Sequence, residues 1–331
     1  MRHVLIRSAA LIFLVAACSQ ETTDDGNFYH AKNISYIVAT DPGGGFDAYA
    51  RLIGKYLKKN LAADNVIIRN TPGAGHLVGA ITLFRSKPDG LTIGTFNMGL
   101  IYGQIVGKPV HTFDLREFEW IGKASGEPRS IVVSNECAIK NMEDLMAAEE
   151  PVKFGSAGLG SASFSDTMLL ATALNLNVHV IPGFEGTEGE MSMMRGEICA
   201  ILGSTSSFTQ FVDSGYGSLI LTIGGEIDGI PNAMDFAETE QARHLIAIID
   251  TLARLGRATA APPGTPKDRV ESLRAAYKAS LEDPDLVAEA NTMGRPIEPA
   301  YGEEVYQLVV SALDQTPEIV AMIKKAIDGA Q

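Results

Sequence analysis

Short apolar runs alternate along this chain with longer stretches in which apolar residues recur every three or four positions. The runs, bounded by Gly, Pro, Asn or Asp, are typical of buried strands, and the longer stretches are typical of helices packed on a sheet. This alternation predicts an α/β protein. The expected strands cover residues 34–39, 66–69, 91–96, 118–123, 131–134, 152–155, 178–181, 200–202 and 219–223. The expected helices cover residues 48–61, 77–84, 141–148, 164–174, a segment ending at 195, 267–281, 285–293, 302–315 and 317–327, whereas residues 225–253 show no pattern that predicts an element.

A glycine-rich turn with the sequence DPGGGFD, residues 41–47, joins the first expected strand to the first long helix. Consecutive glycines can adopt positive φ and let a ligand approach the backbone closely. The helix that follows directs its unpaired N–H groups and the positive end of its dipole to the same point. The turn therefore predicts a small anion site, although a tight strand-to-helix turn without a ligand explains the same glycines.

A second turn of this kind, NTPGAGH at residues 70–76, precedes the helix 77–84. The spacing of Gly73, Gly75 and Gly79 differs from the G-x-G-x-x-G fingerprint of dinucleotide sites, so nucleotide binding is not expected. Asn97 follows the strand 91–96, at the carboxyl end where open α/β sheets bind ligands.

A third glycine-rich turn, SAGLGSAS at residues 156–163, stands before the helix 164–174. Ser161 or Ser163 can cap this helix, and Asp166 falls in its first turn. The turn repeats the arrangement of the first one: glycines and small hydroxyl residues, then a helix N-terminus.

The N-terminal segment has the features of an export signal. Arg2 and Arg7 precede an apolar run over residues 9–17, which is too short to cross a bilayer. Small residues directly before Cys18 resemble a bacterial lipobox and predict a signal peptide of residues 1–17, lipidation of Cys18 and a flexible tether of residues 18–32. An ordinary secretory signal with an accidental cysteine is the alternative.

Composition narrows the remaining possibilities. The 331 residues include 27 Lys and Arg against 40 Asp and Glu, a formal charge of −13 that becomes more negative when the two signal arginines are removed. Such a charge argues against nucleic acid and anionic lipid as partners. Export permits a disulfide between Cys137 and Cys199, but their spacing does not require one, and the apolar surroundings of Cys199 favour a buried thiol.

Five motifs occur in order along the chain: DPGGGFD at 41–47 with Ala50-Arg51, NTPGAG at 70–75, PDG at 88–90, GLGSAS at 158–163 and APPGTPK at 261–267. Together they resemble the extracytoplasmic solute receptors of tripartite tricarboxylate transporters, over nearly all of residues 34–327. The resemblance implies a two-lobed periplasmic-binding-protein (Venus flytrap) fold, with a sheet in each lobe and a ligand cleft between them. Residues 33–128 and 254–331 would form the first lobe, and residues 129–253 the second.

The resemblance also implies that a small carboxylate binds in the cleft and passes to permease subunits in the membrane, with no catalytic activity, cofactor or metal. The expected ligand-binding residues are Gly43, Gly44, Gly45, Phe46, Asp47, Gly75, His76, Asn97, Gly158, Gly160, Ser161, Ser163, Phe184 and Ser204. The chain departs from the family pattern at Asp41, Ala162, Phe164 and residues 182–185. Because these positions bear on the distal end of the ligand, the identity of the carboxylate is not predicted.

The residues themselves favour a cation-free grip on this carboxylate. The proposed loops contain no Lys or Arg, so backbone N–H groups and serine hydroxyls would hold it, at about 1.5–3 kcal/mol for each charge-assisted hydrogen bond. Three or four such bonds, less the cost of ordering and desolvation, suffice for micromolar binding, about −8 kcal/mol.

Two other functions fit parts of the sequence. An exported hydrolase of similar architecture could use Ser161, Ser163, His76, His179 and Asp47, but no G-x-S-x-G elbow and no metal-ligand spacing accompanies them. His179 lies in an apolar strand, where a satisfied core histidine is the commoner outcome. A ligand-binding sensor that docks a signalling protein would use the same lobes as a transport receptor.

Overall fold

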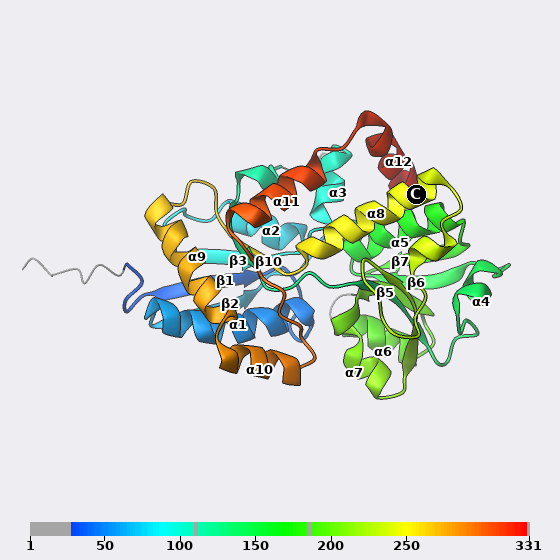
Figure 1. The fold of residues 1–331 in the computed structure, drawn as a ribbon, viewed down its shortest axis with the longest axis horizontal. Coiled ribbons are helices and arrows are strands. Elements are labelled where there is room, and N and C mark those ends of the chain that lie inside the picture. Colours follow the sequence, from blue (N-terminus) through cyan, green and yellow to red (C-terminus); the bar gives the residue numbers. More distant parts are fainter. Residues whose placement is uncertain (1–27, 109–111, 185–186, 330–331) are drawn as a thin grey trace, which may run out of the picture.

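The computed structural model describes residues 28–108, 112–184 and 187–329. The predicted signal peptide, Cys18 and all but the last residues of the predicted tether lie outside this range. Two mixed sheets with covering helices lie side by side along the long axis of the molecule (Figure 1). The half that contains the first sheet is called the first lobe below, and the other half the second lobe. This two-lobed α/β architecture is the predicted fold class.

The first sheet has the strand order β11-β4-β10-β3-β1-β2 among the described residues. β1 pairs in parallel with β2 and β3, whereas β10 runs antiparallel to β3 and β4. Its strands are β1 (Asn33–Val38), β2 (Asn65–Asn70), β3 (Thr92–Thr95), β4 (Glu119–Lys123), β10 (Ala258–Ala261) and β11 (Ala300–Tyr301).

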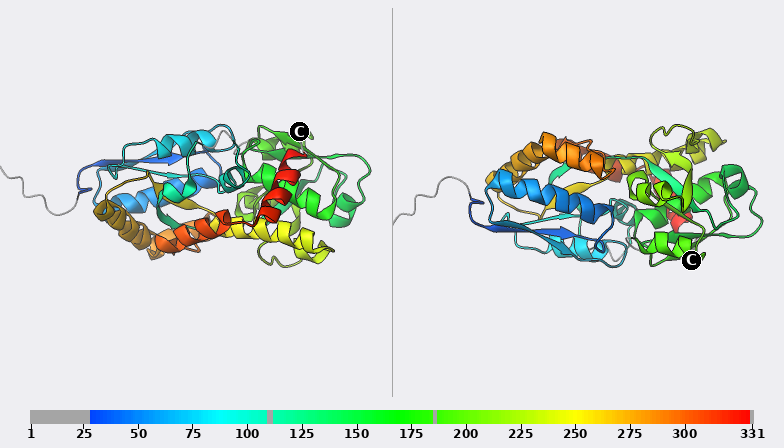
Figure 2. Two further views of the ribbon diagram at one scale, coloured as in Figure 1. Left: turned by 90° about the horizontal axis from the view of Figure 1, so that it is seen from above. Right: turned by 90° about the horizontal axis from the view of Figure 1, so that it is seen from below.

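Helices cover both faces of the first sheet, as the alternation of side chains along β1 requires. Tyr36 and Val38 share a buried cluster with α1 (Gly45–Leu61) and α9 (Lys267–Leu281), while Ile37 and Ala39 belong to a cluster with α2 (Leu77–Phe84) and α11 (Glu303–Leu313). Figure 2 shows α1 and α2 on opposite sides of the strands. The remaining helices of this lobe are α3 (Leu100–Ile105), η1 (Leu115–Glu117) and α10 (Pro284–Thr292).

The second sheet has the order β7-β6-β8-β5-β9 in the described chain. β6 is parallel to β7 and β8, and β5 is antiparallel to β8 and β9. Its strands are β5 (Arg129–Ser134), β6 (Val152–Ser156), β7 (Val178–Pro182), β8 (Ala200–Ser204) and β9 (Gly217–Ile223). Its helical segments are α4 (Met142–Met146), α5 (Ala162–Leu174), α6 (Glu188–Met194), η2 (Thr205–Ser207), α7 (Thr209–Asp213), η3 (Ala233–Phe236) and α8 (Glu240–Leu255).

Two hydrogen-bonded segments connect the lobes next to each other. The chain leaves β4 through residues 124–128 and returns from α8 through Gly256 and Arg257; the Ala124 N–H donates to the Arg257 carbonyl at 3.1 Å and the Arg257 N–H to the Ser125 carbonyl at 2.9 Å. Gly256 has φ +37°, and a Cβ there would lie 1.9 Å from the Ser125 oxygen. Only glycine therefore permits the two segments to pass so closely.

A third crossing leads from α11 to α12 (Pro317–Asp328), which packs against α5 and α8 of the second lobe. Ile323, Ala326 and Ile327 of α12 are buried by this contact. The predicted lobe boundaries place residues 254–331 in the first lobe, whereas α12 packs on the second lobe. The boundaries themselves remain a prediction. An amphipathic pattern shows that a helix has a buried face without showing which sheet covers it.

The helix α8 occupies much of the stretch for which no element was predicted. Thr239 caps it by accepting a hydrogen bond from the Ala242 N–H at 3.1 Å, and Leu245, Ile246, Ile249 and Leu252 line its buried face. Short α3 and the four-residue β10, made of Ala and Thr, were not predicted either. Among the described residues, no helix is both long and apolar enough to cross a bilayer.

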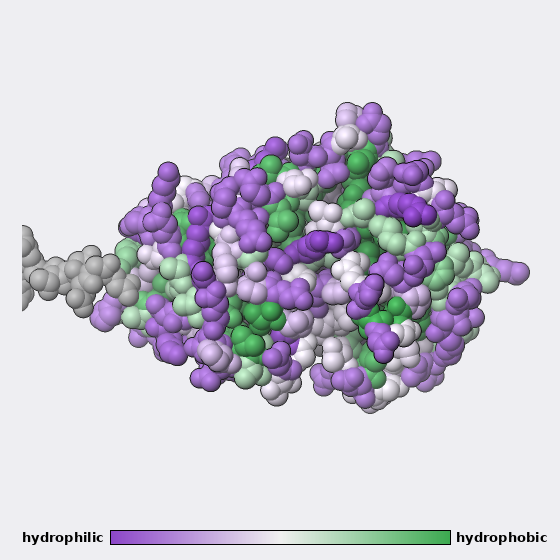
Figure 3. All heavy atoms as spheres, viewed as in Figure 1, coloured by the Kyte–Doolittle hydropathy of each residue, from purple (hydrophilic) through white to green (hydrophobic). Residues whose placement is uncertain are grey.

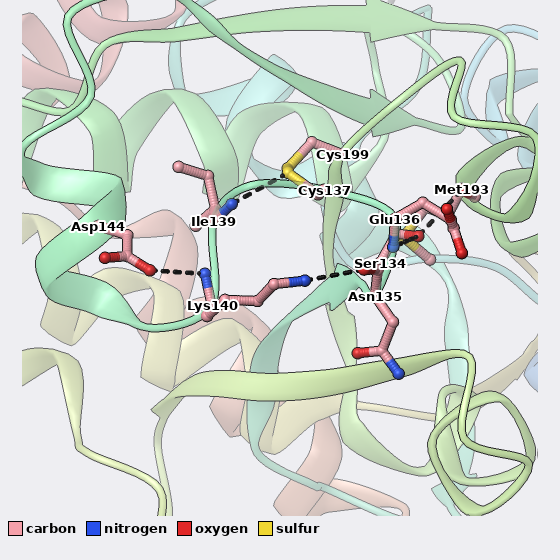
Figure 4. The surroundings of a disulfide bond; sticks show 9 residues. All are labelled: Ser134, Asn135, Glu136, Cys137, Ile139, Lys140, Asp144, Met193 and Cys199. Carbon is pink, nitrogen blue, oxygen red and sulfur yellow. Dashed lines mark hydrogen bonds between the residues drawn. A yellow bond between two sulfur atoms is a disulfide. The ribbon is translucent and has the colours of Figure 1, made fainter.

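Cys137 and Cys199 form a disulfide, with their Cα atoms 5.3 Å apart, so the expectation of a buried thiol was wrong (Figure 4). Cys199 precedes β8, and the turn after β5 carries Cys137 next to it. The Ser134 hydroxyl holds that turn in place, because it donates to the Met193 carbonyl at 3.0 Å and accepts from the Glu136 N–H at 3.2 Å. Pairing depended on this tertiary contact, which the spacing of the cysteines does not reveal.

Candidate functional site

The first glycine turn forms the N-terminal end of α1. Gly43 has φ +92°, a conformation that glycine adopts readily, whereas Gly44 is extended with φ −78°. Asp47 shapes the turn, because its carboxylate accepts hydrogen bonds from the Gly43 N–H at 3.0 Å, Arg51 Nε at 2.8 Å and Asn70 Nδ2 at 3.0 Å. Burial alone would raise the pKa of Asp47, but these donors outweigh it and lower the pKa. Asp47 thus stabilises the conformation of the loop.

His76 lies at the start of α2 in the left-handed conformation, with φ +77°. Its ring is buried, 5.7 Å from the ring of Phe46, and Nδ1 has no hydrogen-bond partner among the described residues. Burial lowers the pKa of His76 to about 4, although a hydrogen bond to the Ala39 backbone opposes the shift. The imidazole is therefore neutral at physiological pH.

Two hydroxyl groups organise the third glycine turn, at the N-terminus of α5. Ser161 caps the helix, as predicted, by accepting from the Phe164 N–H at 3.2 Å, and it donates to the Gly158 carbonyl at 2.7 Å. Ser163 accepts from the Ala157 N–H at 3.1 Å. The Ser161 hydroxyl therefore uses its donor and accepts a hydrogen bond within the loop and the first turn of α5.

The second and third glycine turns touch each other across the two lobes. A Cβ on Gly75 would lie 2.5 Å from the Ser161 backbone nitrogen, and a Cβ on Gly158 would lie 3.0 Å from the Gly75 nitrogen. A Cβ on Gly160 would lie 3.2 Å from the Ala74 oxygen. These glycines permit backbone contact between the lobes.

A polar cavity of about 170 Å³ lies between the lobes, beside this contact. It is lined by nine of the predicted residues: Gly43, Gly44, Gly45, Phe46, His76, Asn97, Ser163, Phe184 and Ser204. The other predicted residues, Asp47, Gly75, Gly158, Gly160 and Ser161, lie outside its lining and support the loops or the lobe contact. A hollow of about 500 Å³ surrounds the disulfide in the second lobe, but it lacks the convergence of buried polar groups that the interlobe cavity has.

Three arginines line the interlobe cavity among the described residues, and none was predicted there. Arg129 pairs with Asp166 at 2.8 Å, Arg257 pairs with Glu127 at 3.1 Å, and Arg295 donates to the carbonyl and hydroxyl of Ser206. The Nε atoms of all three are buried without a hydrogen-bond partner in the described chain.

The expectation that no cation would line the site was therefore wrong, because three arginine side chains of the described chain line the cavity. The glycine loops themselves contain no cation, but Arg129 begins β5, Arg257 precedes β10 and Arg295 follows α10. These elements are far apart in the sequence and meet only in the folded protein. A charged residue at the start of an apolar strand is the signal that could have indicated Arg129 and Arg257. Because β5 and β10 run antiparallel to β8 and β3, their amino ends lie beside the carboxyl ends of those strands, where ligands bind.

Buried acids balance two of these arginines. Burial raises the pKa of Asp166, while Arg129 and a 2.8 Å hydrogen bond from the Tyr102 hydroxyl oppose the shift. Because Tyr102 belongs to α3 of the first lobe and Asp166 to α5, this bond links the two lobes. Glu127, in the segment that connects the lobes, also accepts hydrogen bonds from the Ser206 N–H and hydroxyl, each at 2.9 Å.

Residues 49–326 match the family model described as "Tripartite tricarboxylate transporter family receptor". The chain belongs to this family. Membership places it among binding proteins and not among enzymes, which overturns the hydrolase alternative. The described residues contain no group of three or more His, Cys, Asp or Glu side chains arranged to hold a metal ion.

Relatives of this receptor family align with nearly the whole chain. A protein of Pseudomonas sp. strain P51, encoded in a tcbD-tcbE intergenic region, is 25% identical over 325 residues, which cover 97% of this chain and 90% of the relative. A protein of Agrobacterium vitis is 26% identical over 277 residues, 80% of this chain and 76% of the relative.

Solved structures confirm the two-lobed periplasmic-binding-protein fold. The periplasmic binding protein BugD superposes with a TM-score of 0.75 at 23% identity, covering 90% of this chain and 98% of BugD. MatC from Rhodopseudomonas palustris with bound malate superposes with a TM-score of 0.73 at 20% identity, covering 87% of this chain and 99% of MatC.

Proposed function

We propose that this protein is an exported solute receptor that captures a small carboxylate in the interlobe cavity and delivers it to tripartite tricarboxylate-type permease subunits. The observation that carries the proposal is the set of three arginine side chains among the described residues, from both lobes, that line one small cavity. Guanidinium groups form strong charge-assisted hydrogen bonds with carboxylates, so an anionic ligand fits this lining.

The N-terminus of α1 adds a second source of positive potential. Gly44 and Gly45 line the cavity at the first turn of this 17-residue helix, where backbone N–H groups have no partner within the helix. A Cβ on Gly45 would lie 2.7 Å from a guanidinium nitrogen of Arg257. The absence of a side chain at this position therefore leaves the backbone and Arg257 accessible to the same ligand.

The size of the cavity favours a small solute. Its volume of about 170 Å³ is below the roughly 300–1,000 Å³ of pockets for drug-sized ligands. Proteins of the same fold have been solved with malate, in MatC, and with adipate, in another R. palustris protein. Both are small carboxylates, which supports the same class for this chain.

A thermal-shift screen tests the proposal on protein that lacks residues 1–18. Mono-, di- and tricarboxylates, amino acids and aromatic acids form the test set, and sugars and nucleotides are the controls. At least one carboxylate is expected to raise the melting temperature. A response to the controls alone would overturn the proposal.

A matched pair of variants connects any response to the cavity. Gly45→Val fills the space beside Arg257 and should abolish the shift, whereas Arg254→Gln removes an exposed arginine, 67% accessible, outside the cavity lining and should retain it. Normal binding by folded Gly45→Val would place the ligand elsewhere.

We further propose that Cys18 is lipidated and anchors the receptor to a membrane by lipid alone. The small residues before Cys18 support this proposal. Mass spectrometry of the mature N-terminus should show a lipidated cysteine, and Cys18→Ser should release the protein from the membrane fraction. An unmodified N-terminus after residue 18 in the wild type would contradict it.

A further inference from the structure

Glu190 is an acid that lines the interlobe cavity, and no residue that the structure describes pairs with it. It lies on α6 of the second lobe, and its carboxyl group has no hydrogen bond or ion pair among the described residues. The other partly or fully buried acids around the cleft, Asp47, Glu127 and Asp166, all accept hydrogen bonds. Burial raises the pKa of Glu190 to about 7, although Arg295 lowers it. Such a group is costly unless a ligand pairs with it.

Arg295 faces the same cavity from the first lobe. Its guanidinium donates to Ser206, and no acid of the described chain lies within 4.0 Å of it. Burial, followed by the charge of Arg257, lowers the pKa of Arg295, while Glu190 raises it. Arg295 and Glu190 therefore affect each other electrostatically but do not form an ion pair.

The charges that line the cavity differ between the two lobes once the ion pairs are counted. Arg129 and Arg257 are each neutralised by a buried acid, through the pairs with Asp166 and Glu127. Arg295 and Glu190 remain, one cation and one acid, on opposite lobes. A dicarboxylate would satisfy the cation but bring a second negative charge to the unpaired acid, which is unfavourable in a partly desolvated site.

We propose that the preferred ligand is a zwitterion, whose carboxylate contacts the arginines and the N-terminus of α1 and whose ammonium group pairs with Glu190. This inference rests on the proposed function and narrows its ligand class. An ammonium group supplies the donor that the carboxyl lacks, and a charge-assisted bond of this kind contributes about tenfold or more in affinity. Because its two ends contact different lobes, such a ligand also favours their closure.

Other titratable groups near Glu190 do not change this assignment. The charged groups that line the cavity from other elements are Arg129, Arg257 and Arg295, with His76 neutral. Glu127 and Asp166 lie behind two of these arginines as their ion-pair partners. The charged groups on or beside α6 are Glu188, Arg195 and Glu197. Arg195 pairs with both Glu188 and Glu197 at 2.7 Å, on the exposed side of the helix. It is therefore already matched and does not compensate Glu190.

Titration calorimetry with matched probes tests the proposal. Butyrate, succinate and 4-aminobutyrate have backbones of the same length and differ in the distal group, and a set of α-amino acids varies the position of the ammonium. For the wild type at pH 8, a zwitterion is expected to bind at least tenfold more tightly than the dicarboxylate of matched length. Glu190→Gln should lose that preference, whereas Glu143→Gln, an exposed position on α4, should keep it.

The possible results distinguish a failure of the zwitterion assignment from a failure of the proposed carboxylate-receptor function. Preference of the wild type for dicarboxylates, or an unchanged preference in folded Glu190→Gln, overturns the zwitterion assignment and leaves the carboxylate receptor standing. If no carboxylate of any class binds, the proposed function itself fails and the assignment falls with it. If the preference for a zwitterion weakens as the pH is lowered from 8 to 6, this loss supports the assignment, because protonation of Glu190 removes the charge that pairs with the ammonium group.

Discussion

At the scale of single residues, the sequence predicted the cavity lining where neighbours in the chain are neighbours in the site. Gly43, Gly44 and Gly45 share one turn at a helix start, and a turn of this kind is recognisable without a structure. The arginines were missed because each belongs to a different element and none stands in a motif. Their role depends on tertiary contacts with Asp166, Glu127 and Ser206, which periodicity does not encode.

The buried imidazole of His76 makes the folded state sensitive to acid. The pKa is about 4 in the folded protein against 6.5 for the free side chain, so the unfolded state takes up the proton first. Its contribution to stability is complete above pH 6.5 and is lost as the pH falls toward 4. From pH 7.5 to 5 this group should cost about 2 kcal/mol.

Urea unfolding at the two pH values checks this loss. His76→Gln, which carries no titrating group, should lose about 2 kcal/mol less than the wild type over the same interval. Parallel losses in the two proteins would show that His76 is protonated without penalty in the folded state.

At the scale of elements, most strands and helices were predicted, but the amphipathic α8, whose buried face carries Leu245, Ile246, Ile249 and Leu252, was missed. α5 is buried on nearly all sides because the sheet, α8 and α12 surround it. The sequence predicted this helix from residue 164 with Ser161 or Ser163 as its cap, and the structure selects Ser161 and begins the helix at Ala162. Three of the four residues of β10 are alanines, which do not favour strands, and the strand is held by pairing with β3 and β4.

The two serines at the start of α5 should respond differently to substitution. Ser161→Ala removes the cap and should lower the free energy of unfolding by about 1 kcal/mol while leaving ligand affinity unchanged, because Ser161 lies outside the cavity lining. Ser163→Ala should weaken ligand binding, since Ser163 lines the cavity. Denaturant unfolding and titration calorimetry on both variants make the comparison, and a loss of affinity in Ser161→Ala alone would contradict the placement of these hydroxyls.

At the scale of the whole molecule, the lobes are in contact through close backbone approaches, as between Gly75 and Ser161, and through buried hydrogen bonds such as that of Tyr102 to Asp166. The face shown in Figure 3 is mainly hydrophilic, with apolar residues in small patches. The fold class followed from the order of elements and from the family motifs. The extent of lobe contact did not, because it depends on which glycines face each other.

Ligand-driven closure should depend on Gly75. Small-angle scattering of the wild type should show a smaller radius of gyration with ligand than without it. Gly75→Ala places a Cβ against the Ser161 backbone and should reduce both this contraction and the affinity. Gly73→Ala is the matched control, because its φ is also positive, at +124°, but its new Cβ would meet Val78 of the same lobe. Contraction of Gly75→Ala to the wild-type radius, or no contraction of a wild type that the ligand stabilises, would exclude this closure.

The position of α12 also determines how the chain can be divided. A fragment of residues 129–253 would contain every strand of the second sheet in the described chain but would lack α12, which shields α5 with Ile323, Ala326 and Ile327. During synthesis on the ribosome, this helix emerges long after the strands of the second sheet, so the second lobe cannot complete its helical layer until residues 317–328 have been made. Neither lobe can therefore be cut out as one continuous segment of the chain. A stop codon before Pro317 would remove α12 and so damage the second lobe, although the strands of that lobe would be intact.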